Sequence, residues 1–275
     1  MARAISVHHG SFGRAALYEH NKPLTTHAHR EGHLIFFLGG SPGQMKIGDR
    51  QYLQSKTSGF AISPWEPHSF QPAHDNECGY VLSLYIKPMW FLENSKSAEY
   101  ALSFGTPVID LTPAIEMWVG RLTSLLLDDR PSEHFDGFLF ETTRNCFDQS
   151  WRLVEQSPQM KNFSIRFNDF RVRRSLRTMQ ENFAEDSSMD ELARQAGLSR
   201  PHFFKLFKMQ MGITPNLYLN MLRTEHAIGE LVSTDKSVTD IGLDLGFASQ
   251  ASFTRFFISN VGIPPTDYRR VAHVI

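Results

Sequence analysis

The first 90 residues alternate short apolar runs with clusters of turn-forming residues. Each run is rich in aromatic or branched side chains, which is the pattern of β-strands. The predicted strands are residues 15–18, 34–38, 45–47, 51–53, 60–62 and 81–86. Turns with glycine or proline separate them, for example at Gly43, Gly48 and Pro64. Many short strands at close spacing predict a sandwich or a barrel.

Residues 112–155 change to the spacing of amphipathic helices. Apolar side chains recur every three or four positions from Ile115 to Leu126 and again from Phe138 to Val154. Thr112 opens the first stretch together with a proline, which is typical of a helix start. We expect two helices that pack on the strands and leave one apolar face for a second subunit.

Residues 188–270 contain the same helical unit twice. Each copy opens with a serine, Ser188 or Ser237, followed three residues later by an acid, which indicates a helix start. The short helix ends at Gly197 or Gly246, where a left-handed backbone can turn the chain. A second helix with inward phenylalanines follows, and both copies end in Gly-Ile-x-Pro-x-x-Tyr. Helix, glycine turn and helix together form a helix-turn-helix unit, whose second helix enters the DNA major groove.

Two such units in register resemble the DNA-binding domain of AraC/XylS-type transcriptional regulators. The resemblance covers about residues 169–270 and rests on Asp-Glu-Leu-Ala at 190–193, Gly-Phe-x-Ser-Gln at 246–250 and Phe-x-Arg-x-Phe at 253–257. It implies two units joined by one long helix, residues 216–233, that read successive major-groove segments on one face of double-stranded DNA. It favours an activator, with RNA polymerase as a further partner.

The start of each second helix is expected to meet base edges. The candidate DNA-contacting residues are Arg200, Pro201, Phe204 and Lys205 in the first unit, and Ser249, Gln250, Ala251, Thr254 and Arg255 in the second. Gln250 can pair with adenine, and Arg255 either reads guanine or holds a phosphate. Phe204 departs from the polar side chains usual in the family and offers only apolar contact. Ser252 and Arg223 are expected at the DNA backbone.

Composition agrees with two folded domains. The chain has 275 residues, 41% of them hydrophobic, and a net charge of −1. Residues 169–275 hold 13 Lys/Arg against 12 Asp/Glu, so DNA binding depends on where the cations lie and not on their sum. No apolar run reaches the ~20 residues that span a bilayer, and no signal-peptide pattern is present. Two separated cysteines, Cys78 and Cys146, fit a reducing compartment. We therefore expect a cytoplasmic protein with no membrane partner.

Histidines form a second pattern among the predicted strands. His27, His29 and His33 lie close in sequence, and His68 ends a segment that begins at Gly59. This is similar to the two motifs of the cupin barrel, the sensor fold that AraC-type regulators commonly carry, although His33 stands where that pattern has an acid. The resemblance implies a barrel that holds one small-molecule effector. The expected lining is His27, His29, His33, Phe36, Trp65, His68 and Tyr85.

The four histidines allow two interpretations. Imidazoles at positions 27, 29, 33 and 68 suit zinc, copper or nickel. Alternatively, the barrel holds no metal and the histidines are polar groups of the ligand pocket. We favour the metal-free pocket and expect no resident cofactor.

The sequence thus predicts an α+β protein. Residues 1–155 are expected to form a cupin-like β-barrel with a helical pair at about 112–155, which senses the effector and makes a homodimer. Residues 156–168 are the predicted linker, and residues 169–275 the all-α double helix-turn-helix domain. The favoured function is a DNA-binding regulator controlled by a small molecule, and not an enzyme. The alternative is a metal-binding cupin enzyme fused to a DNA-binding module.

Overall fold

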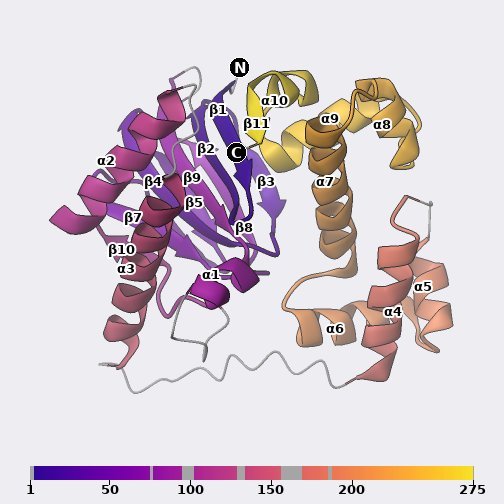
Figure 1. Cartoon of the computed structure of the whole chain (residues 1–275). Coiled ribbons are helices and arrows are strands. Elements are labelled where there is room, and N and C mark those ends of the chain that lie inside the picture. The colour runs from indigo at the N-terminus through magenta and orange to yellow at the C-terminus, as the bar shows by residue number, and fades with distance from the viewer. Residues whose placement is uncertain are drawn as a thin grey trace.

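The computed structural model describes residues 3–74, 77–94, 102–128, 134–155, 169–184 and 188–274. Its N-terminal part consists of strands covered on one side by helices, and its C-terminal part is helical except for a short final strand (Figure 1). The α+β class predicted from the sequence is therefore confirmed. The predicted linker, residues 156–168, lies outside the described residues.

The strands of the described residues form two sheets. They are β1 (Arg3–Gly10), β2 (Gly13–His20), β3 (Leu24–His27), β4 (Gly32–Gly40), β5 (Gly43–Ile47), β6 (Arg50–Leu53), β7 (Ser58–Ile62), β8 (His68–Pro72), β9 (Gly79–Ile86), β10 (Val108–Asp110) and β11 (Ala272–Val274). The larger sheet has the order β10-β7-β4-β9-β2-β1-β11, and the smaller one β3-β8-β5-β6. Neighbours are antiparallel, except that β11 runs parallel to β1.

The six strands predicted from the apolar runs are present as β2, β4, β5, β6, β7 and β9. The predicted closed barrel is not confirmed. Among the described strands, hydrogen-bonded pairing stays within each sheet, and β10, β11, β3 and β6 are the four edges. The two sheets therefore face each other across an apolar core without joining at their edges.

The two-residue period of a strand gives the larger sheet two different faces. Leu34 and Phe36 of β4 pack with α1 (Pro88–Asn94), α2 (Pro113–Leu127) and α3 (Phe135–Glu155), which cover one face (Figure 1). Ile35 and Phe37 belong instead to the core shared with the smaller sheet. The helices α2 and α3 confirm the predicted helical pair. The prediction that Phe36 lines the pocket is wrong, because three positions along a strand place it on the face opposite His33.

Seven helices follow in the described C-terminal residues. They are α4 (Phe170–Glu181), α5 (Met189–Gln195), α6 (Arg200–Met211), α7 (Pro215–Ser233), α8 (Val238–Asp244), α9 (Gln250–Val261) and α10 (Pro265–Val271). The two helix-turn-helix units are α5–α6 and α8–α9, and α7 joins them. Ser188 and Ser237 cap α5 and α8 as predicted. Gly197 and Gly246 adopt φ angles of 68° and 81°, so both turns use the left-handed backbone that glycine allows.

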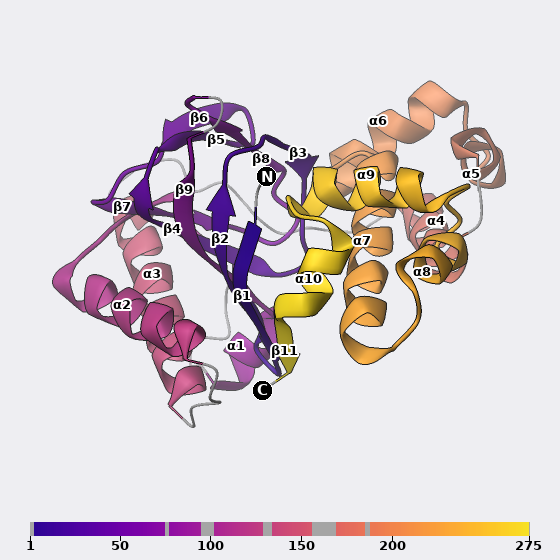
Figure 2. The same cartoon turned by 90° about the horizontal axis from the view of Figure 1, so that it is seen from above.

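The two units differ in what they pack against. Phe203 and Phe207 of the first unit lie in a cluster formed mainly by α4 to α7. Phe253 and Phe257 of the second unit belong to the same apolar cluster as Phe70 and other residues between the sheets. Figure 2 shows α9 and α10 beside β1 and β3. The second unit is therefore docked on the N-terminal strands.

Polar contacts join the same surfaces. The Thr25 hydroxyl donates to the Ser259 carbonyl oxygen over 2.8 Å, and the Tyr268 hydroxyl and His9 Nε2 are 3.0 Å apart. The strand β11 adds a further backbone link to β1.

No helix within the described residues combines the length and the apolar character that crossing a membrane would require.

Candidate DNA interface and ligand site

The helices α6 and α9 each bury one side and present the other. Phe203, Phe207, Phe253 and Phe257 are fully buried. Of the residues predicted to contact DNA, the exposed ones are Arg200, Pro201, Lys205, Ser249, Gln250, Ala251 and Arg255, and the half-buried ones are Phe204, Ser252 and Thr254. The fold thus places them on the helix sides that phenylalanine packing leaves open. Their contact with DNA stays a prediction.

On α6, the exposed side begins with an ion pair. Arg200 Nη1 lies 3.1 Å from Asp190 Oδ2, and both side chains are more than half exposed. An ion pair in this setting contributes little stability, so a phosphate or a base can replace the carboxylate at small cost. Phe204 packs edge-on against Phe203 and lies under the Arg200 guanidinium. Phe204 therefore also packs within the first unit, against Phe203 and Arg200.

On α9, two serines shape the helix start. Ser249 and Ser252 form a reciprocal capping box, in which each side chain accepts from the other residue's backbone N–H. Gln250 Oε1 accepts from the Thr239 hydroxyl over 2.9 Å, which ties α9 to α8. Arg255 is exposed one turn further along. The capping bonds fix the start of the helix that carries Gln250 and Arg255.

Arg223 on α7 makes contacts within the protein. Its Nε donates to the Phe183 carbonyl oxygen over 2.8 Å, and its guanidinium lies 5.4 Å from the ring centre of Phe247. Arg223 thus links the end of α4, the middle of α7 and the turn of the second unit. The backbone contact to DNA predicted for it stays a prediction.

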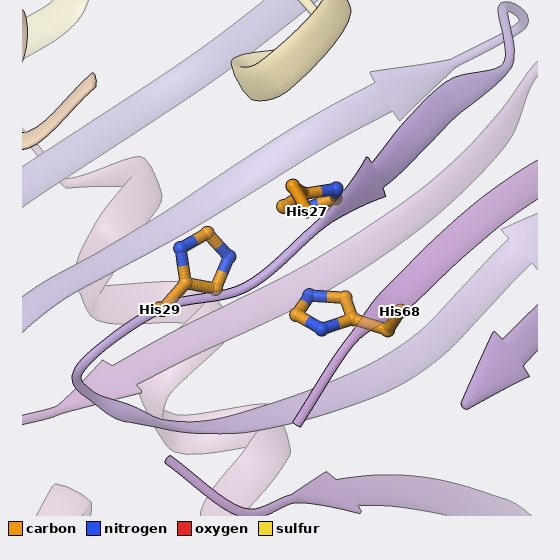
Figure 3. Close-up of side chains that lie close together, drawn as sticks. All are labelled: His27, His29 and His68. Carbon is orange, nitrogen blue, oxygen red and sulfur yellow. The ribbon is translucent and has the colours of Figure 1, made fainter. Parts of the chain in front are cut away.

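The four histidines of the cupin-like pattern are all buried and lie together. His27 ends β3, His29 follows it, His68 opens β8 opposite His27, and His33 is on β4. One nitrogen from each of His27, His29 and His68 lies within 4.8 Å of the other two (Figure 3). His33 Nδ1 lies 3.4 Å from His68 Nε2. The sequence pattern therefore identified residues that the fold brings into one cluster.

Burial keeps these imidazoles neutral. It lowers the pKa of His27 to about 4 and that of His68 to about 3. Burial, reinforced by the neighbouring imidazoles, also lowers the pKa values of His29 and His33 well below the ordinary value. At neutral pH each ring therefore carries one N–H and one lone pair.

Tyr85 and Trp65, two aromatic residues of the expected pocket lining, lie in different surroundings. Tyr85 stacks on His33 with ring centres 4.1 Å apart and meets His29 edge-on. Trp65 stacks instead on Tyr218 of α7, with ring centres 5.8 Å apart. The reason is its position in the turn before β8, which directs the indole towards the C-terminal helices. Trp65 is an interdomain contact.

A cavity of about 360 Å³ lies beside the histidine cluster, between the strands and α7. His27 and His29 form part of its wall, together with Arg14, while α7 supplies Leu217 and Met221. No local pattern in the sequence predicts this cavity, because its walls come from segments about 200 residues apart. A smaller space of about 30 Å³ lies between the sheets, where the effector was expected. The larger cavity is the better candidate for a ligand.

Charged groups also line the cavity. Arg14 is buried, its guanidinium lies 3.7 Å from the ring centre of Tyr85, and its Nε has no hydrogen-bond partner among the described residues. Glu225 of α7 faces the same cavity. Burial raises the pKa of Glu225 to about 7, although Arg30, at 3.3 Å, acts in the opposite direction. A buried cation with an unused donor is suited to an acidic group of a ligand.

Comparison with known proteins agrees with this architecture. Residues 192–271 match a family model described as a helix-turn-helix domain. The probable transcriptional regulator LumQ of Photobacterium leiognathi is 26% identical over 254 residues, which cover 90% of this chain and 93% of LumQ. An uncharacterized HTH-type transcriptional regulator of Staphylococcus aureus is 38% identical over 102 residues. That match covers 37% of this chain but only 14% of the staphylococcal protein.

Solved structures extend the likeness over the whole fold. ToxT from Vibrio cholerae superposes with a TM-score of 0.56 at 13% identity, covering 94% of this chain and 97% of ToxT. A structure of ToxT with an unsaturated fatty acid bound gives the same TM-score at 12% identity and covers 94% of each chain. At these identities the likeness concerns the fold alone.

The paired helix-turn-helix units and their match to regulators define a DNA-binding transcriptional regulator. Residues 192–271 carry the helix-turn-helix match, which is of the AraC type.

Proposed function

We propose that this regulator controls transcription in response to a small molecule bound in the cavity between the strands and α7. The observation that carries the proposal is the composition of the cavity wall, which combines sensor residues such as Arg14 with Leu217 and Met221 of α7. Because α7 joins the two DNA-reading units, a ligand that contacts it can change how they are held. A ligand alters the equilibrium by its difference in affinity for the two arrangements.

The proposed effector is an organic acid with an apolar body. Arg14 supplies a buried cation, and Leu217, Met221 and Ile228 supply apolar surface. ToxT, which shares the fold, has been solved with an unsaturated fatty acid and with a naphthalenyl butenoic acid. These ligands were bound to ToxT, and they support the same ligand class for this chain.

The remaining parts of the proposal concern the assembly of the regulator and whether it activates transcription. We propose that the two facing sheets serve as a cupin-like scaffold, and that the helical pair α2–α3 makes a homodimer. Met117 and Leu127 on α2 are exposed apolar side chains that a second subunit would cover. The regulator would act as an activator that engages RNA polymerase. The histidine cluster would serve regulation and not turnover.

The test uses two neighbouring tryptophan substitutions on α7. Leu217 lines the cavity, whereas Asn216 is exposed beside it. Leu217→Trp should occupy ligand space and reduce the response of DNA affinity to the effector at least about tenfold. Asn216→Trp should respond like the wild type. The measurement is fluorescence anisotropy on a DNA site selected from a random pool, with unsaturated fatty acids and aryl-alkenoic acids as test compounds.

Two outcomes would contradict the proposal. If no DNA sequence is enriched over the pool, sequence-specific regulation is wrong. If a compound changes the DNA affinity of Leu217→Trp as much as that of the wild type, the ligand binds elsewhere.

A further inference from the structure

Three histidine rings, those of His27, His29 and His68, gather round one space (Figure 3). They come from the end of β3, the segment after it and the start of β8. Their closest nitrogens lie within 4.8 Å of one another. Nitrogens bound to one tetrahedral zinc ion at about 2.0–2.1 Å stand roughly 3.3 Å apart. Small rotations of the rings would therefore bring all three to one ion.

Backbone carbonyls fix the orientation of two of these rings. His27 Nδ1 lies 2.7 Å from the Thr25 carbonyl oxygen, and His68 Nδ1 lies 2.9 Å from the Glu66 carbonyl oxygen. A carbonyl only accepts, so each Nδ1 carries the proton and each Nε2 keeps its lone pair. Metal-binding histidines are held in this way, with the second nitrogen donating to a carbonyl or a carboxylate.

The third ring has an unused nitrogen. His29 Nε2 is buried and has no hydrogen-bond partner among the described residues. A buried polar atom without a partner is costly, and a bound cation would provide the missing interaction. His33 adjoins this group: its Nδ1 lies 3.4 Å from His68 Nε2, its ring centre lies 5.4 Å from that of His29, and it stacks on Tyr85. The nitrogens that lie within 4.8 Å of one another belong to His27, His29 and His68. His33 is therefore a neighbour of the site and not one of its three ligands.

From this geometry we propose that His27, His29 and His68 bind a divalent transition-metal ion, with Zn²⁺ as the reference ion. Three neutral imidazoles suit zinc, copper or nickel and leave a fourth coordination position. His27 and His29 also line the cavity beside α7, so the ion would be reached from that cavity. Glu31 lies on the same wall, where its carboxylate offsets part of the positive charge that Arg14 contributes.

The test measures metal binding by the full-length protein without DNA, so its outcome does not depend on the proposed function. The protein is stripped with a chelator, dialysed and titrated with Zn²⁺ against a chromophoric competitor, and separately with Co²⁺ while its visible absorption is followed. We expect one equivalent to bind, with the intense Co²⁺ bands of four-coordinate geometry. His29→Gln and His68→Gln should weaken binding by roughly 100-fold or more.

The matched control is His20→Gln. His20 is also buried within the sheets, but it packs against Tyr18 and Phe70 outside the three-histidine group. It should bind Zn²⁺ like the wild type. If a ligand variant does not fold, the number of imidazole ligands on wild-type-bound metal, counted by X-ray absorption, decides the question. Less than one equivalent bound, unchanged affinity in both folded ligand variants, or fewer than three imidazoles would overturn the proposal.

Discussion

The glycine turns of the two helix-turn-helix units allow a matched test of how the second unit is held. Gly197 and Gly246 have similar φ angles, 68° and 81°. A Cβ added at Gly197 would meet nothing within 4 Å, whereas one added at Gly246 would lie 1.9 Å from the Ala184 carbonyl oxygen. The same Gly→Ala change therefore isolates the contact between the second unit's turn and the segment after α4.

The expected magnitudes follow from these distances. Alanine in the left-handed region costs about 1–2 kcal/mol, and Gly197→Ala should lose about that much stability. Gly246→Ala carries the same cost, and Ala184 must also move by more than 1 Å to restore normal contact. Overpacking of this kind costs about 1–3 kcal/mol more. We therefore expect Gly246→Ala to be less stable than Gly197→Ala by about 1–3 kcal/mol.

Urea unfolding, followed by circular dichroism, measures the stability of both variants. The dependence of the unfolding free energy on urea concentration should be compared first, because a difference between the variants would indicate more than one transition. Specific DNA binding of each variant should be measured in parallel, and Gly246→Ala should be the weaker binder. Equal losses of stability in the two variants would refute the reasoning, since the cost of alanine in the left-handed region would then be the whole effect.

Further predictions concern DNA contacts, pH and the C-terminus. Gln250→Ala and Arg255→Ala should each weaken specific binding by about 1–3 kcal/mol, and unchanged affinity and base preference at fixed salt would count against the placement of α9. Burial lowers the pKa of His20 to about 4 from 6.5, so the unfolded chain binds more protons in that window and stability should fall as pH drops from 6.5 towards 4. His20→Gln should lessen this slope in thermal unfolding, and an identical slope would contradict the assignment. Removal of residues 272–275, which deletes β11, should speed hydrogen exchange in β1, whereas unchanged exchange would mean that the pairing contributes nothing.

Local signals in the sequence predicted local structure well. The serine caps at 188 and 237, the glycine turns and the helical pair all depend on residues three or four positions apart, and the structure confirms them. The histidine cluster was also predictable, because a recognisable spacing carries it. Phe36 was misplaced although the period of two from His33 already assigns it to the opposite face.

Long-range packing could not be predicted in the same way. The docking of Phe253 and Phe257 against the sheets joins segments about 200 residues apart, and no local pattern distinguishes these residues from Phe203 and Phe207 of the first unit. The cavity has the same origin, since Arg14 and Met221 meet only after docking. Closure of the barrel likewise depends on pairing between sheet edges, which apolar runs do not specify.

The parallel pairing of β11 with β1 has a consequence for biosynthesis. Val7 pairs with Ala272, which is 265 residues later in the chain. At about 5–20 residues per second, the ribosome needs roughly 15 to 50 s to make the second partner after the first. During that interval β1 presents an unpaired strand edge, which other chains can extend. The nascent protein should therefore depend on chaperones most until residues 272–274 emerge.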